Sequence, residues 1–169
     1  TGPPQLENLP RYNITYISKT DSLEDLTEVW ESIITALKNK QKVLWVTNSV
    51  KTCIEIYRTA QTKLAQELPE LSTNPLIYHS RFRYQDRLQK HKAVIQAFKT
   101  NEAVLAITTQ VCEMSLDLNA DLLISALATA AALVQRLGRL NRNMIKSEQG
   151  AKTAIIYPWD NSKPYNHDD

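Results

Sequence analysis

Glycine and cysteine are scarce in this sequence of 169 residues, which has three glycines and two cysteines. The glycines stand at positions 2, 138 and 150, and neither Gly-x-x-x-x-Gly-Lys-Ser/Thr nor Gly-x-Gly-x-x-Gly occurs. The chain therefore lacks a phosphate-binding loop, and we do not expect it to hydrolyse nucleotides independently. Cys53 and Cys112 are too few for a disulfide framework or a four-cysteine zinc site. Both lie in apolar periodic segments, which predicts buried, reduced thiols.

Long apolar runs are missing as well. No run reaches the ~18 residues that a membrane-spanning helix needs, and the first residues lack the basic and then apolar pattern of a signal peptide. We therefore expect a soluble, cytoplasmic protein. The tail His167-Asp168-Asp169 offers no second histidine, which favours a frayed polar end over a metal site. With 43% hydrophobic and 22% charged residues, the composition is that of a single globular domain.

Charge is nearly balanced at +2, but it is unevenly distributed. Residues 21–31 contain five acidic side chains and no basic one, whereas residues 79–92 and 135–146 are strongly basic. The basic side chains are Arg81, Arg83, Arg87, Lys90, Lys92, Arg136, Arg139, Arg142 and Lys146. Two such stretches meeting on one surface would contact phosphates, and the alternative is that both are ordinary solvated faces.

Short apolar runs alternate with segments of helical periodicity along the chain. Strands are predicted at residues 12–17, 43–46, 75–78, 103–108, 121–127 and 151–157, and helices at 21–38, 49–64, 88–98 and 130–140. The third helix repeats the pattern of inward apolar side chains with Leu88, Val94, Ile95 and Phe98, and Asp21 is expected to cap the first helix. This alternation predicts an α/β fold, a parallel sheet covered by helices on both faces. We expect an irregular lead-in at 1–11, one lobe at 12–158, and a tail or linker at 159–169.

In such a sheet ligands bind beside the carboxyl ends of the strands, which selects the loops after residues 46, 78 and 108 and the helix near residue 139. Several residues there also have plain structural explanations. Asn48 or Ser49 is suited to cap a helix, and Ser80 to form a turn. Trp30 and Trp45 fall at expected core positions, which favours packing over base stacking.

The most informative stretch is QRLGRLNR at residues 135–142. Its three arginines stand at three-residue spacing, and their planar guanidinium groups are suited to grip phosphate oxygens. Shortly before it, residues 108–118 read TTQVCEMSLDL, where a strand opens into a loop of hydroxyl and acidic side chains. The two stretches together are far more specific than either alone.

With these motifs the sequence resembles the second RecA-like lobe of superfamily 2 helicases, and within them the CRISPR-associated helicase-nuclease of type I systems. Residues 43–49 resemble helicase motif IV, 108–118 with Asp121 motif V, and 135–142 motif VI. The His-Ser-Arg-Phe run at 79–82, followed by Asp86-Arg87, resembles a further family motif. The resemblance covers residues 12–158. The chain departs from the family pattern at 126–132, where proline and an acidic residue are missing.

The resemblance implies a role for each matching residue. Arg139 and Arg142 would be arginine fingers that reach the γ-phosphate of ATP, Gln135 would order that site, and Asp117 would contact the ribose. Arg136 would bind on the nucleotide side or play a supporting, structural role. The residues at positions that contact the nucleic-acid backbone are Thr47, Asn48, Ser80, Arg81, Thr109 and Gln110. Instead of contacting phosphates, Arg81 and Arg87 could pair with Glu113 or Asp117 and brace the loops.

The expected function is therefore that of the second motor lobe of an ATP-dependent single-stranded-DNA translocase in CRISPR interference in a prokaryotic cytoplasm. ATP and Mg²⁺ would be held mainly by a first lobe in the same or another chain. The other expected partners are single-stranded DNA, the CRISPR surveillance complex and a nuclease domain located elsewhere, with no membrane. The alternatives are a non-catalytic nucleic-acid-binding module, lobe two of another superfamily 2 helicase, or a flavodoxin-like enzyme. The glutamine and arginines of 135–142 speak against the binding module, because backbone binding alone needs no arginine at an ATP cleft.

Overall fold

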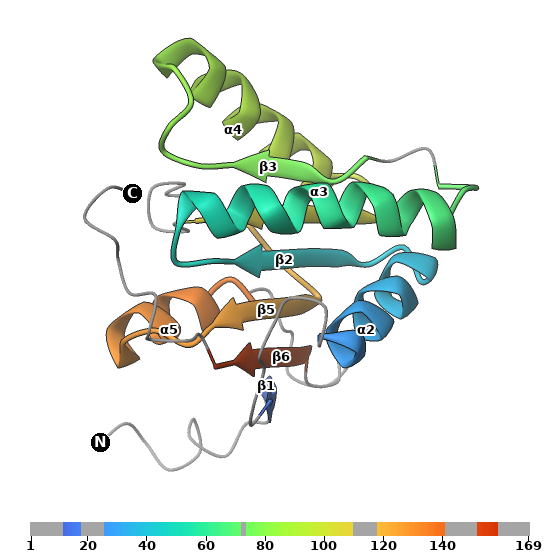
Figure 1. Ribbon diagram of the computed structural model, residues 1–169, viewed down its shortest axis with the longest axis vertical. Helices are drawn as coiled ribbons and strands as arrows, with labels where there is room; N and C mark the ends of the chain where they lie inside the picture. Colours follow the sequence, from blue (N-terminus) through green and yellow to red (C-terminus); the bar gives the residue numbers. More distant parts are fainter. Residues whose placement is uncertain (1–11, 18–25, 72–73, 110–117, 141–151, 159–169) are drawn as a thin grey trace.

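The computed structural model describes residues 12–17, 26–71, 74–109, 118–140 and 152–158. Six parallel strands form one sheet in the order β1-β6-β5-β2-β4-β3 (Figure 1). The strands are β1 (Tyr12–Tyr16), β2 (Lys42–Val46), β3 (Leu76–Tyr78), β4 (Val104–Thr108), β5 (Leu122–Ala126) and β6 (Lys152–Tyr157). The helices described are α2 (Thr27–Lys38), α3 (Val50–Glu67), α4 (Tyr84–Lys99) and α5 (Ala130–Leu137). The predicted parallel α/β architecture is confirmed.

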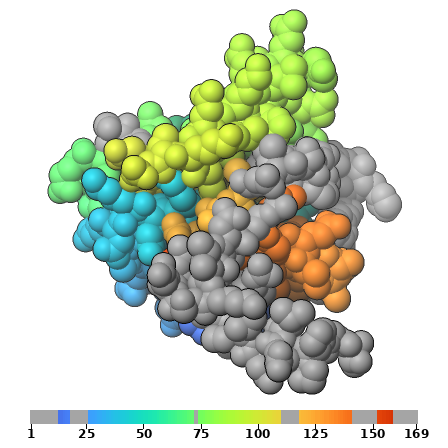
Figure 2. Space-filling model, turned by 180° about the vertical axis from the view of Figure 1, so that it is seen from behind, coloured from blue at the N-terminus to red at the C-terminus, as the bar shows by residue number. Residues whose placement is uncertain are grey.

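Both faces of the sheet are covered, which explains why the central strands are mostly apolar. Every residue of β2, β4 and β5 is buried. Because side chains alternate between faces, Trp45 of β2 packs with α2 and α3, whereas its neighbours Leu44 and Val46 pack with Val94 of α4. Figure 1 shows α2 and α3 in front of the sheet, and the view from behind in Figure 2 shows α4 on the opposite face.

Trp45 is the centre of the larger core cluster. Its side chain is completely buried, with ring centroids 5.2 Å from Trp30 and 6.0 Å from Tyr157. The indole Nε1–H donates to the Tyr157 hydroxyl at 3.1 Å, which satisfies a donor that burial would otherwise leave unpaired. Burial also raises the pKa of Tyr157, so its phenol stays protonated. The predicted packing role of both tryptophans is confirmed.

Local polar contacts define where the helices begin. Ser49 precedes α3, and its hydroxyl accepts from the Thr52 backbone N–H at 3.2 Å, so the capping explanation is confirmed for Ser49. Thr129 caps α5 in the same way, accepting from the Ala132 N–H at 3.3 Å. The cap predicted at Asp21 lies outside the described residues.

Two predictions about the helices are wrong. Leu88 was expected to be buried but is 41% exposed, because the amino-terminal turns of α4 project away from the sheet and Val94 is the helix's buried residue (Figures 1 and 2). The helix expected at 130–140 ends at Leu137. Tighter bonds from the N–H of Arg139 to the carbonyl of Arg136, and from Leu140 to Leu137, close its last turn.

Cys53 is completely buried and reduced, as predicted, while Cys112 and the tail of residues 159–169 lie outside the described residues. In the described part of the chain, no helix combines the length and apolar character that crossing a bilayer requires.

Replacing Tyr157 by Phe leaves the buried Trp45 N–H without its acceptor. We expect this variant to lose about 1–3 kcal/mol of unfolding free energy, measured by urea denaturation. Tyr16→Phe is the matched control, because Tyr16 is 54% exposed, and its change should stay within about 0.5 kcal/mol. Equal denaturation midpoints for the two variants would contradict the packing role of this bond.

Burial raises the pKa of the Cys53 thiol to about 12, against an opposing hydrogen bond from Thr47. At pH 8 this leaves a thiolate fraction of about 10⁻⁴, compared with roughly a quarter for an exposed thiol. In a Cys112→Ser background, we expect alkylation of the native chain by iodoacetamide to be at least ~10³-fold slower than alkylation in guanidinium. Similar rates in the two solvents would show that the thiol is accessible in the folded chain.

Candidate functional site

The parallel strands bring their carboxyl ends to one edge of the sheet, and most of the predicted site residues in the described part of the chain lie there. The turn of residues 47–49 follows β2, Thr109 follows β4, and residues 127–129 connect β5 to α5. Figure 1 shows α5 at this edge, beside the ends of β5 and β6. We call this region the carboxyl edge.

A single buried arginine connects three parts of the carboxyl edge. Arg136 of α5 is only 8% exposed. Its Nη1 donates to the Ser125 hydroxyl at 2.9 Å and to the Ala126 carbonyl at 3.1 Å, and its Nη2 donates to Asn48 Oδ1 at 3.0 Å. These contacts favour the supporting role that the sequence left open for Arg136 over direct contact with a nucleotide.

Asn48 is held from both ends of its amide group. Its Oδ1 accepts from Arg136, and its Nδ2 donates to the Leu127 carbonyl at 2.9 Å. An asparagine amide carries two N–H donors, so among the described residues the second hydrogen of Asn48 has no acceptor. The residue is half-buried, which leaves the amide group accessible at the edge.

The two threonines predicted to contact nucleic acid are buried instead of lining the surface. Thr47 has no exposed area; its hydroxyl lies 3.1 Å from the Ser49 carbonyl and 3.3 Å from the Thr108 carbonyl, and its N–H donates to Thr108. In this arrangement the Thr47 side chain supports the turn after β2. Thr109 is 4% exposed, and among the described residues its hydroxyl has no hydrogen-bond partner.

The nucleotide-side residues lie on and just after α5. Gln135 is exposed, and Arg139 is half-buried in the turn that follows the helix. The Arg139 carbonyl accepts from the Ala120 N–H at 2.8 Å, which fixes this turn against the segment that leads into β5. Arg142, Asp117 and Gln110 lie outside the described residues.

The loop between β3 and α4 presents Ser80 and Arg81 to solvent. Beneath them, the buried His79 ring stacks on Phe82 at a centroid distance of 4.0 Å, and His79 Nδ1 accepts from the Arg81 backbone N–H at 3.2 Å. Burial and the nearby cations of Arg81 and Lys90 lower the pKa of His79, so the ring is neutral at pH 7. The stack therefore shapes the loop that carries the two exposed residues.

The alternative explanations for the loop's arginines remain predictions. Arg87 lies over the Tyr84 ring, with its guanidinium carbon 5.9 Å from the ring centroid. Glu113 and Asp117, the acidic partners considered for Arg81 and Arg87, lie outside the described residues.

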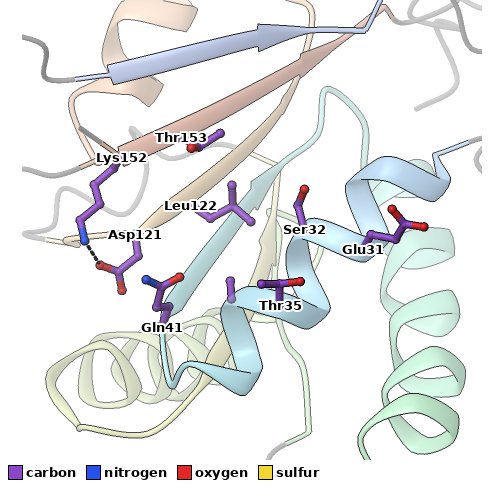
Figure 3. Close-up of a pocket in the computed structure, with 9 residues that line it drawn as sticks. Glu31, Ser32, Thr35, Gln41, Asp121, Leu122, Lys152 and Thr153 are labelled. Carbon is purple, nitrogen blue, oxygen red and sulfur yellow. Dashed lines mark ion pairs between the residues drawn. The ribbon is translucent and has the colours of Figure 1, made fainter. Parts of the chain in front are cut away.

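A cavity of about 560 Å³ lies at the opposite, amino edge of the sheet (Figure 3). Its lining includes Gln41, Asp121 and Lys152 but none of the predicted site residues. The Asp121 carboxylate pairs with Lys152 at 3.1 Å and accepts from the Lys42 backbone N–H at 2.8 Å. These contacts join the starts of β2, β5 and β6, so we assign them a structural role and place the candidate site at the carboxyl edge.

The described residues contain no group of three or more His, Cys, Asp and Glu side chains arranged to hold a metal ion. The residue that sequence reasoning missed at the carboxyl edge is Ser125. The sequence does mark Ser125, because it is the polar residue within the otherwise apolar strand LLISA. A hydroxyl buried in a central strand needs a partner, and here it donates to the Ala126 carbonyl at 2.8 Å and accepts from Arg136.

Comparison with known proteins gives a consistent result. Residues 39–145, more than half of the chain, match the family described as CRISPR-associated nuclease/helicase Cas3, C-terminal. A putative CRISPR-associated nuclease/helicase Cas3 of Myxococcus xanthus is 43% identical over 166 residues, covering 97% of this chain and 20% of that protein. The CRISPR-associated endonuclease/helicase Cas3 of Escherichia coli is 35% identical over 143 residues, covering 79% of this chain and 15% of that protein.

Solved structures agree with the fold. The crystal structure of T. fusca Cas3 superposes with a TM-score of 0.73 at 22% identity, covering 90% of this chain and 19% of that one. Its ATP complex gives 0.71 at the same identity and coverage. A chain in a CRISPR RNA-guided surveillance complex in a pre-nicking state gives 0.63 at 24% identity, covering 91% and 19%.

The present chain thus spans 20% and 15% of the length of these two curated relatives. The family match and the parallel α/β fold lead to the same assignment: the chain belongs to the CRISPR-associated nuclease/helicase Cas3 family and corresponds to its C-terminal helicase lobe.

Proposed function

We propose that this chain is the second motor lobe of an ATP-dependent translocase on single-stranded DNA that acts in CRISPR interference. The observation that carries the proposal is the contact between Arg136 of α5 and Asn48 of the turn after β2, which joins two predicted site residues from elements that are distant in sequence. Relatives named as nuclease/helicase, and one named in a surveillance complex, support the same assignment.

The nucleotide side of the proposal rests on α5 and the turn after it. When bound, ATP with Mg²⁺ supplies the phosphoanhydride bond whose hydrolysis drives movement, and both are held mainly by a first lobe outside this chain. The amide of Gln135 and the guanidinium of Arg139 are the donor types that suit phosphate oxygens, so the residues present fit the group. A T. fusca relative with this fold is named as an ATP complex.

Arg139 acts as an arginine finger in this proposal, with Arg142 as the second. A cation delivered by a separate lobe stabilises transition-state charge only when the two lobes close. Turnover by the lobe pair therefore depends on closure, and the chain by itself contributes only part of the site.

The nucleic-acid side consists of the exposed loop after β3 and the turn after β2. Ser80 and Arg81 are exposed, and the amide of Asn48 is accessible, so these three side chains can reach phosphates. Because Thr47 and Thr109 are buried, we assign them to the support of the two turns. Such contacts grip the backbone without reading bases, as a translocase requires.

Arg139→Ala tests the finger assignment in the polypeptide that contains both lobes. We expect turnover stimulated by single-stranded DNA to fall by about 10³-fold or more, because one transition-state cation is lost. The readout is phosphate release under saturating ATP and DNA. Arg58→Ala is the matched control, since Arg58 is an exposed arginine on α3.

A loss of less than about threefold would remove Arg139 from the finger role. The 169-residue chain alone should release no phosphate in the same assay, because it lacks a phosphate-binding loop.

Arg81→Gln tests the backbone grip through salt dependence. Each phosphate neutralised on a single strand contributes about 0.7 to the slope of log affinity against log salt, so we expect the slope to fall by about 0.7. Fluorescence anisotropy of a labelled oligothymidylate over a series of salt concentrations measures it. An unchanged slope, equal to that of Arg58→Gln, would place Arg81 outside the DNA path.

A further inference from the structure

We propose that Arg136 is a positioning residue that links the strand-gripping amide of Asn48 to the helix that carries Gln135 and leads to Arg139. The proposal rests on the proposed function and deepens it, because it assigns the physical connection between the nucleic-acid side and the nucleotide side of the lobe. Arg136 itself touches neither ligand in this account.

The connection is direct and buried. Arg136 lies 88 residues from Asn48 in sequence, and its Nη2 donates to Asn48 Oδ1 at 3.0 Å. The Nη1 of the same guanidinium holds Ser125 Oγ at 2.9 Å and the Ala126 carbonyl at 3.1 Å, at the end of the central strand β5. One rigid planar group therefore joins α5, β5 and the turn after β2.

This contact sets the orientation of the Asn48 amide. With its oxygen held by Arg136 and one N–H held by the Leu127 carbonyl, the amide plane is fixed at two points. The remaining N–H is then presented in one direction from a half-buried residue. Arg136 thus acts on a phosphate through Asn48.

Arginine is specifically suited to this position. The guanidinium carries five donors in a fixed plane, whereas a lysine ammonium presents its donors from a single point and cannot span β5 and the β2 turn with the same geometry. A buried cation is also costly to desolvate, and replacing buried ionic groups by well-packed apolar residues is often neutral or stabilising in proteins. Its presence is therefore better explained by coupling than by stability.

Backbone carbonyls supply two of the acceptors at this point. Residues 126–132 contain no carboxylate, but the carbonyls of Ala126 and Leu127 accept from Arg136 and Asn48. A displacement of α5 relative to β5 therefore changes the Arg136 contacts and the orientation of Asn48 together. Movement of α5 in response to nucleotide would therefore alter the contact between the Asn48 amide and DNA.

A double-mutant cycle in the complete two-lobed polypeptide tests the link. The probe is a fluorescein-labelled oligothymidylate, and the variants are Arg136→Gln, Asn48→Ala and the pair. We expect each single change to raise Kd by about tenfold, and the pair to raise it no further, because Arg136 acts through Asn48. An additive increase of about a hundredfold in the pair would overturn the proposal.

The salt dependence separates positioning from direct contact. Arg136→Gln removes a charge, so the slope of log affinity against log salt should fall by about 0.7 if Arg136 binds a phosphate itself. We expect an unchanged slope, together with a reduced ratio of DNA-stimulated to basal ATP turnover and an unchanged KM for ATP. A fall in thermal midpoint with unchanged Kd and stimulation would show a merely structural role and overturn the proposal.

Ser125→Ala is a milder variant that keeps the test available if Arg136→Gln does not fold. It removes one acceptor of Arg136 and leaves every predicted ligand contact in place. We expect Kd to rise by about threefold in the wild-type background and not at all in the Asn48→Ala background. Equal increases in both backgrounds would overturn the link.

Failure of the proposed function and failure of the Arg136 link give different results. If the wild-type polypeptide binds the oligonucleotide without DNA-stimulated turnover, the proposed function fails, and the binding cycle still decides the role of Arg136. If it binds no single-stranded DNA, both fail. If turnover is stimulated and the cycle is additive, only the Arg136 link fails.

Discussion

The parallel alignment of all six strands is the constraint on which the rest of the structure depends. It requires every strand to be followed by a crossover, so that β2, β4 and β5 are buried on both faces and every carboxyl end lies at one edge. Residues 48, 109 and 136 come together only because of this alignment. The same constraint places the Asp121 and Lys152 pair at the far edge, where it joins strand starts and lies away from the candidate site.

Within that edge, the polar contacts form one connected set. The Arg136 guanidinium is satisfied by a serine hydroxyl, a strand carbonyl and an asparagine amide, and the asparagine is held in turn by the next carbonyl along the chain. Buried polar groups of this kind specify one arrangement, because each alternative leaves a donor unpaired in a low-dielectric environment. Gln135 is exposed on the same helix, and Arg139 is half-buried in the turn that follows it.

Sequence patterns were sufficient for the fold but not for all of the site. Alternating apolar runs predicted the strands and helices because burial on both faces leaves a continuous hydrophobic signature in β2 and β5. Burial of Leu88 was predicted wrongly, since helical periodicity does not tell how far a helix extends beyond the sheet. The early end of α5 was also missed, because it depends on the contact between Arg139 and Ala120.

The sequence predicted which residues belong to the site, but not which of their side chains are accessible. Motif positions selected Thr47, Asn48 and Arg136 together, yet only the tertiary structure separates the accessible amide of Asn48 from the buried hydroxyl of Thr47 and the buried guanidinium of Arg136. Ser125 was not selected, since its role exists only once α5 lies against β5. Contacts between elements far apart in sequence carry this information, and local patterns do not contain it.

A structure of the complete two-lobed polypeptide with a non-hydrolysable ATP analogue and single-stranded DNA would test the motor assignment most directly. We expect Arg139 to lie within hydrogen-bonding distance of the γ-phosphate, and Asn48 to donate to a DNA phosphate while still bound to Arg136. A complex in which Arg139 faces away from the nucleotide would contradict the motor assignment. One in which Arg136 has left Asn48 to bind a phosphate itself would contradict the positioning role.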